Sequence, residues 1–455
     1  MPNPKSISTN TPTRRPKGYT SRLTAYNILM EHYETGKYLK ALWRRMPGNL
    51  PDNDKTFVRE VCLGTLRWQR LLDYNINLYL SNKKTKPSVM TAIRLTAYQL
   101  LFLSSVPAYA AVNTGVEIIK QVEGKHAAGF GNAILKKIQQ NGLRRRTGNS
   151  AKALSINTSH PLWLVKKWAR EIPLENLMHT LNHNNNHRRI WVRINLRKTS
   201  VSEFLSQMTQ SYPDLHPVNS AAENFPFIRF ESGISHLLHS DMFKEGHFSF
   251  QDPASWYAMQ LANWKEGQAV LDLCSAPGGK AACLVEMASH DTPVICSDVS
   301  FYRLKQIENT RERLGHQQLT PLVMDGRAPC FKTGFDIVLV DAPCSNLGVL
   351  DKRPEAKWRN TEAQLSKYAL LQKELLHHAS EVCKLSGSIV YSTCSPEPEE
   401  TMEVIQAFLD EHEFWEIEDA GNFLPSHLVQ QGCMHLSPGA NGFDGFFAAR
   451  LIRKV

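Results

Sequence analysis

Apolar residues recur at helical intervals through the first third of the chain. Over residues 20–142 the segments between short polar turns keep this spacing, and SRLTAYNILMEHY places Leu23, Tyr26 and Leu29 on one face, with Ser21 as the expected cap. A succession of such segments is typical of a helical bundle. Residues 20–142 are therefore predicted to form an all-α domain.

The pattern then becomes mixed. Residues 143–155, LRRRTGNSAKALS, are polar and basic and are predicted to be a linker. After them, the amphipathic segment HPLWLVKKWAREI precedes the alternating run RRIWVRINLRK, a further helical segment and the strand-like FPFIRF. This order predicts a small α+β segment over residues 156–245, whose basic strand could contact a phosphate backbone.

Strands and helices alternate from residue 246 onward. QAVLDLC, PVICSD, PLVMDG, FDIVLVD and GSIVYSTC are apolar strand-like runs separated by helical patterns, and GFFAARLIRKV supplies a late antiparallel strand. Residues 246–455 are therefore predicted to form a doubly wound, Rossmann-like α/β domain. In such a domain the ligand binds along the C-terminal ends of the strands. The complete chain is predicted to be a multidomain α and α/β protein.

Charge is distributed unevenly along the chain, whose net charge is +10. Residues 1–200 carry 33 Lys and Arg against 10 Asp and Glu, whereas residues 201–455 carry 20 against 33. Solvated helix faces explain scattered lysines but not this surplus, so the first half is predicted to bind nucleic acid. The candidate RNA contacts are Arg22, Arg59, Arg67, Lys136, Lys137 and Arg193.

The termini and the cysteines restrict the cellular setting. Residues 1–19 are rich in Pro, Ser, Thr and basic residues, so we predict a short disordered arm without the apolar core of a signal peptide. The nine cysteines form no CxxC pair and no Cys/His cluster, which predicts no disulfide, no metal site and a cytoplasmic location. The longest apolar stretch contains polar residues and Pro107, so no membrane span is expected. Nothing indicates an obligate dimer, and a monomer is expected.

A glycine pair follows the first strand of the α/β domain, in LDLCSAPGGK. Gly278 and Gly279 allow the backbone to approach a ligand and allow a helix to begin at once. Asp298 ends the second strand, where a carboxylate can accept ribose hydroxyls, and Asp325 ends the third, within reach of an adenine edge. Without a third glycine, S-adenosylmethionine suits the pattern better than a dinucleotide, and a turn without ligand is the alternative. The predicted cofactor-binding residues are Cys274, Ser275, Ala276, Pro277, Gly278, Gly279, Lys280, Asp298, Arg303, Asp325 and Asp341.

Two cysteines end neighbouring strands in nearly the same setting. Cys344 lies in VLVDAPCSNLGVL and Cys394 in YSTCSPEPEE. Each could be a nucleophile or a small core residue, because free cysteine is among the most buried residue types. Ser395 and Pro396 predict a helix that starts directly after Cys394, and its positive end would favour the thiolate, although the nearby glutamates partly offset this effect. Local features therefore favour Cys394 only weakly.

Taken in order, these motifs resemble a known enzyme family. LDLCSAPGGK, DAPCS, STCS, EGHFSFQDPAS and DGFFAARL are similar to the signature set of the Nop/Sun family of RNA cytosine-5 methyltransferases. YQLLFLSSVPAYAAVNTGVE and AGFGNAILKKI resemble the NusB-like RNA-binding domain of one branch, and SHPLWLVKKW with WVRINLRK resembles the joining segment. From about residue 20 to residue 455, the chain resembles the RsmB (Sun/Fmu) type of 16S ribosomal RNA methyltransferase.

The resemblance implies roles for particular residues. Cys394 would attack carbon 6 of cytosine, Cys344 would assist breakdown of the adduct, Asp341 would hydrogen-bond the cytosine edge, and Lys280 would contact the base or the cofactor. S-adenosylmethionine would be the cofactor and 16S ribosomal RNA the partner. Cys274 is expected to be a packing residue, since such cysteines occur in the family without a catalytic role.

One departure and three alternatives stay open. Ser345, Asn346 and Leu347 follow Cys344 where many members have a small residue and then Thr, which is expected to alter loop packing around the base. The alternatives are an RNA-binding ribosome-assembly factor without catalysis, a DNA methyltransferase in which Cys344 is the nucleophile, and methylation of a transfer RNA or 23S ribosomal RNA. The first would be expected to lack a site residue, and the second does not account for STCS or the NusB-like segment.

Overall fold

The computed structural model describes residues 16, 18–80, 84–186, 190–212, 217–219, 225–230, 234–288, 291–332 and 334–454. Almost all of the predicted N-terminal arm lies outside these residues. The chain divides into two compact units, Met1–Glu171 and Ile172–Val455. No helix of the described residues is both long enough and apolar enough to cross a bilayer.

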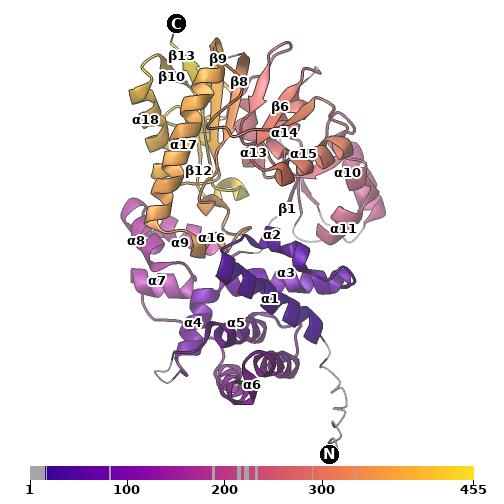
Figure 1. Cartoon of the computed structure of the whole chain (residues 1–455), viewed down its shortest axis with the longest axis vertical. Helices are drawn as coiled ribbons and strands as arrows, with labels where there is room; N and C mark the ends of the chain where they lie inside the picture. The colour runs from indigo at the N-terminus through magenta and orange to yellow at the C-terminus, as the bar shows by residue number, and fades with distance from the viewer. Residues whose placement is uncertain are drawn as a thin grey trace, which may run out of the picture. The chain divides into compact units, whose positions relative to one another are not determined.

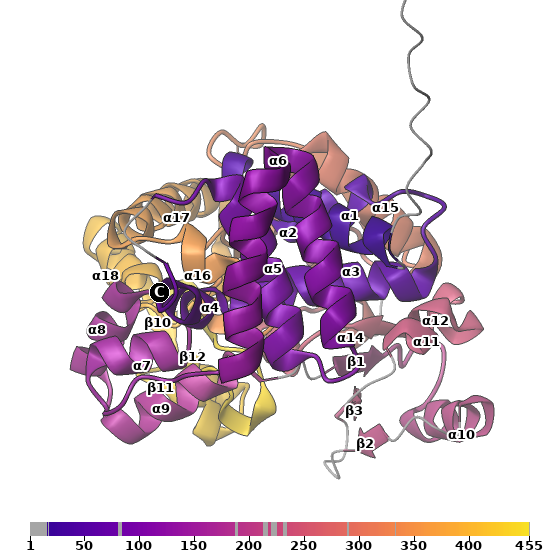
Figure 2. The same ribbon diagram turned by 90° about the horizontal axis from the view of Figure 1, so that it is seen from below.

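The first unit is helical, as the apolar spacing predicts (Figure 1). α5 packs along α6 (Figure 2), and Gly115 makes the close approach possible, because a Cβ there would lie 2.1 Å from Thr96 Oγ1. Gly124, with φ of 85°, interrupts the helical geometry of α6. The elements are α1 (Tyr19–Thr35), α2 (Leu39–Leu42), η1 (Trp43–Arg45), α3 (Asp52–Arg67), α4 (Gln69–Asn77), α5 (Pro87–Phe102), α6 (Ala108–Asn141), α7 (Ala151–Asn157) and α8 (Leu162–Glu171).

Two local predictions in this unit are wrong. Ser21 does not cap α1, because the helix already begins at Tyr19, after Gly18 in a left-handed conformation. The predicted linker is helical in its last five residues, because the Ser150 hydroxyl accepts a hydrogen bond from Ala153 N and caps α7.

The second unit opens with a four-stranded antiparallel sheet of order β2-β3-β1-β4. Val192 on β1 pairs with Ile228 on β3 and with Phe250 on β4, so the small α+β segment recruits a strand from beyond its predicted end at residue 245. Phe204 packs against Phe248 in its core. The elements are α9 (Leu174–His183), β1 (Ile190–Ile194), α10 (Val201–Ser211), β2 (Pro217–Asn219), β3 (Phe227–Phe230), α11 (Ile234–His239), α12 (Asp241–Lys244) and β4 (Phe248–Phe250).

A nine-stranded sheet dominates the described residues of the second unit. Its elements and the helices and short turns around them are α13 (Pro253–Gln260), β5 (Val270–Asp272), α14 (Gly279–Met287), β6 (Val294–Asp298), α15 (Phe301–Leu314), β7 (Leu319–Val323), β8 (Phe335–Asp341), η2 (Leu347–Val349), α16 (Ala356–Arg359), α17 (Glu362–Val382), β9 (Cys383–Thr393), η3 (Pro398–Glu400), α18 (Met402–Glu411), β10 (Trp415–Glu418), η4 (Ala420–Asn422), η5 (Ser426–Leu428), β11 (Val429–Gln430), β12 (Cys433–Leu436), η6 (Ala440–Gly442) and β13 (Phe446–Arg453).

The strand order is β11-β12-β13-β9-β8-β5-β6-β7, with β10 also paired to β13. β9, β8, β5, β6 and β7 are parallel and β13 is antiparallel to β9, which confirms the predicted Rossmann-like domain with a late antiparallel strand. Helices cover both faces (Figure 1). Ile337 and Leu339 therefore pack in one core cluster with α13 and α14, and the alternate Val338 and Val340 in the other with α17 and α18.

A buried ion pair joins the four-stranded sheet to a helix that covers the nine-stranded sheet. Arg193 of β1 is 2% exposed, and its Nε lies 2.8 Å from a carboxylate oxygen of Glu286 on α14. The guanidinium also donates to Gln251, and His316 Nε2 lies 3.1 Å from Glu286. A charge this deeply buried is tolerated only with such partners. The pair therefore holds β1 against α14.

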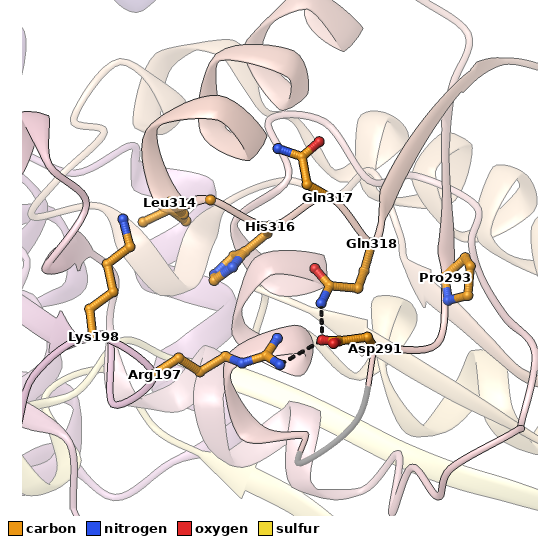
Figure 3. Close-up of a pocket in the computed structure, with 9 residues that line it drawn as sticks. Arg197, Lys198, Asp291, Pro293, Leu314, His316, Gln317 and Gln318 are labelled. Atoms are coloured by element: carbon orange, nitrogen blue, oxygen red, sulfur yellow. Dashed lines mark hydrogen bonds and ion pairs between the residues drawn. The ribbon is translucent and has the colours of Figure 1, made fainter.

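Replacing Glu286 with alanine is expected to lower the free energy of unfolding of this unit by about 3–5 kcal/mol, because Arg193 is left buried without its counter-charge. Urea denaturation followed by circular dichroism measures the change. The matched control is Asp291→Ala. Asp291 pairs with Arg197 (Figure 3), but its side chain is 77% exposed, so its loss should change the stability little. Equal losses in both variants would contradict the assignment.

The same effect should depend on pH. Burial raises the pKa of Glu286, but Arg193 and His316 outweigh it, so the pKa in the folded protein lies below that of the unfolded chain. The stabilisation is therefore present at neutral pH and is lost as the pH falls through the folded-state pKa. Wild type and Glu286→Ala should converge in stability in acid.

Candidate active site

Cys344 and Cys394 meet beyond the C-terminal ends of two adjacent parallel strands. Asp341 on β8 is in register with Ser392 on β9, and Ala342 N continues the ladder by donating to Ser392 O at 3.0 Å. Cys344 comes three residues after Asp341, and Cys394 comes two residues after Ser392. Their Sγ atoms lie 3.2 Å apart. The structure therefore places both sequence-predicted cysteines at one point.

Backbone contacts hold the two cysteine loops together. Gly348 N, just beyond Cys344, donates to Cys394 O at 3.0 Å, and Gly348 O accepts from Gly445 N at 2.9 Å. A Cβ at Gly348 would lie 2.2 Å from Gly445 O and 2.8 Å from Cys394 O. Only glycine fits between these chains, and its place in the loop is explained by this close approach.

Electrostatics distinguishes the two thiols. A hydrogen bond from Cys344 lowers the pKa of Cys394; burial opposes this effect, and the nearby Arg353 cation reinforces it. Lys280 acts in the same direction, whereas Asp341 raises this pKa. The same hydrogen bond raises the pKa of Cys344, and so does its burial. Cys394 is therefore the better thiolate, and Cys344 is a thiol that donates to it.

The predicted helix directly after Cys394 is absent from the described structure. Residues 395–397 form no regular element, η3 is only three residues long, and α18 begins at Met402. The Ser395 hydroxyl accepts from Glu397 N at 3.2 Å and donates to Glu400, so it forms a local turn and does not cap a helix. The thiolate is thus favoured by neighbouring side chains, and the helix-end explanation was wrong.

Asn346 and Arg353 line the same loop. Arg353 donates to Asn346 Oδ1 at 2.6 Å, and this oxygen lies 3.4 Å from Cys394 Sγ. Asn346 Nδ2 donates to Cys344 O at 2.8 Å, with the Asn346 backbone in the left-handed region at φ of 60°. Asparagine tolerates this conformation. The departure noted after Cys344 therefore places an amide beside the candidate nucleophile.

Lys280 and Asp341 form a pair next to the cysteines. Lys280 Nζ lies 2.7 Å from Asp341 Oδ2, and Ser392 Oγ donates to Asp341 Oδ1 at 3.1 Å. Burial lowers the pKa of Lys280, but Asp341 outweighs it and raises the pKa overall. Lys280 is therefore a charged donor between the cysteines and the glycine turn.

The glycine turn provides space for a ligand. Gly278 has φ of 92° and Gly279 begins α14, and a Cβ on Gly279 would meet no atom closer than Gln251 Nε2 at 3.8 Å. Below the turn, among the described residues, neither carboxylate oxygen of the fully buried Asp272 forms a hydrogen bond of good geometry. Burial, with Asp341 nearby, raises the pKa of Asp272 to about 7. An open backbone next to a buried carboxylate that Ser275 and the Cys274 backbone approach suits a ligand that carries an ammonium group.

Of the two predicted nucleoside-binding aspartates, Asp298 ends its strand as expected, whereas the third strand ends at Val323, before Asp325. Asp298, buried at the end of β6, pairs with Arg303 at 2.9 Å and accepts from Ser300 N at 2.9 Å. Asp325 lies two residues beyond β7 and is paired with Arg327 at 2.8 Å. Cys274 packs against the core cluster of α17, and burial raises its pKa, as expected of a packing residue. Ser275, Ala276 and Pro277 form the turn before Gly278.

The predicted RNA contacts divide into two groups. The prediction that Arg193 contacts RNA is wrong, because its guanidinium is buried in the pair with Glu286. Arg22, 6% exposed and bonded to Gln99 Oε1 at 2.6 Å, and Arg67, 7% exposed, are too buried to grip a phosphate. The exposed candidates, which stay predictions, are Arg59, Lys136 and Lys137.

Two pockets lie elsewhere in the second unit. One, of about 510 Å³, is lined by Pro293 before β6 and by His316 and Gln318 before β7, and therefore lies at the amino ends of these strands (Figure 3). The other, of about 530 Å³, lies where α17 ends, and includes His377 and His412. Neither contains a predicted site residue.

Among the described residues, one cluster of side chains has the geometry of a metal site. His377, His378 and Glu381 on α17 are the one group whose ligand-type atoms lie within 4.8 Å of one another. They are at least partly exposed and next to the amino end of β9, at the edge of the sheet opposite the cysteines. The prediction of no metal stays a prediction.

Three side chains of the cysteine site were missed. Glu400 accepts hydrogen bonds from both loops, Asn346 contacts Cys394, and Arg353 donates to Asn346 and acts on Cys394 through its charge. Glu400 carried a signal, an acidic residue close after a candidate nucleophile, but its burial could not be inferred from such a polar stretch. Arg353 carried none, since it lies 41 positions from Cys394.

Comparisons with known proteins give a consistent family. The model of the 16S rRNA methyltransferase RsmB/F family matches residues 259–452, that of the NusB family residues 19–140, and that of the RsmF/B-like ferredoxin-like domain residues 160–224. The second unit therefore has the ferredoxin-like and methyltransferase segments in the predicted order.

Relatives cover nearly the whole chain. The chain is 30% identical over 415 residues to the "Probable ribosomal RNA small subunit methyltransferase B" of Bacillus subtilis (strain 168), covering 89% of this chain and 92% of that protein. It is 29% identical over 445 residues to "Ribosomal RNA small subunit methyltransferase B" of Yersinia pestis bv. Antiqua (strain Angola). This match covers 96% of this chain and 99% of that protein.

Solved structures share the fold. The crystal structure of PH0851 matches with a TM-score of 0.79 and 24% identity, over 98% of this chain and 100% of that chain. NSun6 from Pyrococcus horikoshii, solved with SFG, matches with a TM-score of 0.57 and 18% identity, over 64% and 98%. At these identities the likeness shows the fold alone.

Replacing Cys344 with alanine is expected to move the alkylation of Cys394 by iodoacetamide to higher pH, because the thiol that donates to Cys394 is removed. Mass spectrometry of the digested protein measures the pH midpoint for each cysteine. Cys330, an exposed cysteine, is the internal reference and should keep one profile in both proteins. A midpoint that stays in place would contradict the hydrogen-bond explanation.

Proposed function

The chain belongs to the 16S rRNA methyltransferase RsmB/F family, and from this membership we propose that it transfers a methyl group from S-adenosylmethionine to carbon 5 of a cytidine in 16S ribosomal RNA. The observation that carries the proposal is the 3.2 Å contact between the sulfur atoms of Cys344 and Cys394. One cysteine suffices for attack on a base. Two unequal cysteines in contact fit a reaction that must both form and break a covalent bond.

The chemistry explains why a thiolate is needed. Carbon 5 of cytosine is a poor nucleophile, and a thiolate that adds to carbon 6 turns the ring into an enamine-like species whose carbon 5 can attack a methyl group. The proton on carbon 5 must then leave, and the carbon–sulfur bond must break. The site must therefore supply a nucleophile, a group that stabilises the base during addition, and a base for elimination.

The residues of the site fit these roles. We assign Cys394 as the nucleophile, since it has the lowered pKa and is less buried than Cys344. Asp341 and Lys280, a charged pair beside the sulfurs, would hold the cytosine edge. Cys344, after losing its own proton to solvent, would as a thiolate accept the proton from carbon 5, directly or through water, while the carbon–sulfur bond breaks and Cys394 leaves as a thiolate.

The cofactor is S-adenosylmethionine, which supplies an electrophilic methyl group when bound. Asp298 would accept the ribose hydroxyls and Asp325 would contact the adenine edge, with Arg303 moving from its pair with Asp298. Asp272 would offer its buried carboxylate to the ammonium group. The backbone from Cys274 to Lys280 would line the site.

The RNA must present an unstacked cytidine, because carbon 6 cannot be attacked within a stacked helix. The exposed cations Arg59, Lys136 and Lys137 would hold phosphates, so that binding weakens with salt. Transfer RNA and 23S ribosomal RNA are the alternative substrates, and the names of the relatives favour the small subunit. A monomeric state and a cytoplasmic location stay predictions.

Replacing Cys394 with alanine is expected to reduce methylation below detection, because it removes the assigned nucleophile for carbon 6. Replacing Cys344 with alanine is expected to slow release, so that a protein–RNA adduct survives denaturing gel electrophoresis. Incorporation of tritiated methyl groups and the gel measure the two effects.

The double replacement serves as the control, since it should give neither product nor adduct. If Cys344→Ala turns over normally without an adduct, the assigned division of roles is wrong. If Cys394→Ala forms the adduct, the two cysteines exchange roles.

Replacing Asp298 with alanine is expected to weaken binding of S-adenosylmethionine about 10- to 100-fold, the effect of losing hydrogen bonds to a buried charged group. Isothermal titration calorimetry without RNA measures it. The control is Asp336→Ala, which removes a carboxylate paired with Lys384 at the amino end of β8. Unchanged affinity in Asp298→Ala would contradict the cofactor site.

A further inference from the structure

Glu400 is a fully buried carboxylate in contact with both cysteine loops. It lies in η3, six positions after Cys394, with 0% of its surface exposed. A carboxylate loses most of its hydration at such a position, and the loss must be offset by hydrogen bonds. Burial raises its pKa, and hydrogen bonds from Ser345 and Ser395 lower it in part.

The carboxylate accepts four hydrogen bonds from three segments. Ser345, the residue after Cys344, donates its backbone N–H to Oε1 at 2.8 Å and its hydroxyl to Oε2 at 2.5 Å. Ser395, the residue after Cys394, donates its hydroxyl to Oε2 at 2.6 Å. Gln372 of α17 donates to Oε1 at 3.1 Å and, through the same amide nitrogen, to Pro343 O at 2.9 Å. One side chain thus binds the residue that follows each cysteine.

The two serines also contact each other, with hydroxyl oxygens 3.2 Å apart. Their loops leave β8 and β9 at neighbouring points, and Glu400 accepts from both serines through the same oxygen. The separation of the two serines is therefore set by one acceptor atom. Ser345 follows Cys344 in the chain and Ser395 follows Cys394. The acceptor atom therefore also limits how far the two sulfurs can separate.

Glu400 also affects the cysteines unequally. Its charge contributes to raising the pKa of Cys344, whereas the charges that lower the pKa of Cys394 belong to Arg353 and Lys280. The carboxylate therefore favours the thiol form of Cys344.

We propose that Glu400 is a positioning residue of the reaction: it holds the Cys344 and Cys394 loops at the separation that keeps the two sulfurs in contact and their roles distinct. The proposal rests on the proposed function for its catalytic consequence. Its structural part concerns the two thiols alone and can be tested without RNA or cofactor.

The test is Glu400→Gln, which preserves the shape of the side chain. Its amide nitrogen replaces one acceptor oxygen with a donor, so it must face a serine hydroxyl or a backbone N–H that itself donates. The matched control is Glu403→Gln, the same chemical change at an exposed position three residues later. Thermal unfolding and the affinity for S-adenosylmethionine are measured for both.

In the first arm, the variants are labelled with iodoacetamide at neutral pH and each cysteine is quantified by mass spectrometry. The ratio of Cys394 to Cys344 labelling should fall in Glu400→Gln and stay constant in Glu403→Gln.

In the second arm, kcat for methylation by Glu400→Gln should fall about 100-fold, the scale of a displacement of about 1 Å in an active site. The fraction of enzyme trapped as adduct should rise, and the affinity for S-adenosylmethionine should not change.

If Glu400→Gln folds and keeps the wild-type labelling ratio, the positioning role is overturned. If it does not fold, Ser345→Ala and Ser395→Ala keep the carboxylate, and each removes one hydrogen bond to it. A fall in the labelling ratio in either supports the proposal, and a wild-type ratio in both overturns it. A changed ratio with no methylation by the wild-type enzyme would refute the proposed function and leave the positioning role intact.

Discussion

Parallel pairing of β8 with β9 is the constraint on which the rest of the site depends. Asp341 is in register with Ser392, so two loops that lie far apart along the chain leave the sheet side by side. A shift of one residue would move every side chain of a strand to the opposite face. Val338 and Val340 prevent such a shift, because each packs against α17 and α18, whereas Ile337 and Leu339 pack on the other side. The contact between Cys344 and Cys394 thus follows from the register of an apolar core.

Buried charges connect segments that lie far apart in the sequence. Lys352, beyond the Cys344 loop, binds Asp252 at 2.8 Å and Asp444 at 2.6 Å, and Asp444 N donates to Asp252. These aspartates belong to QDPAS and DGFF, two motifs for which sequence reasoning offered no physical role. Arg193 with Glu286 joins β1 to α14 in the same manner. Such pairs add little net stability compared with apolar contacts, but removing one partner is costly.

Much of the fold could be predicted from the sequence because apolar periodicity determines element type. The five parallel strands of the Rossmann-like domain and the late antiparallel β13 follow from it, whereas β10, β11, β12 and the order of the strands in the sheet were not predicted. Local errors arose where a neighbour outside the segment decides the outcome: β4 joins β1 across more than fifty residues, and the chain after Cys394 forms a turn around Glu400 in place of a helix. Arg193 shows the limit most clearly, since a basic strand indicates RNA until Glu286 is seen beside it. Both cysteines and Asp298 could be placed because the strand ends converge. The partners of these side chains, such as Arg303 beside Asp298, could not be predicted.

Mapping of 5-methylcytidine tests the central claim most directly. Bisulfite sequencing of 16S, 23S and transfer RNA would compare wild-type cells with cells lacking this protein. The account predicts that one cytidine of 16S ribosomal RNA loses its methyl group, and that the intact protein restores it whereas Cys394→Ala does not. An unchanged 16S map, with loss of methylation in transfer or 23S RNA or nowhere, would contradict it.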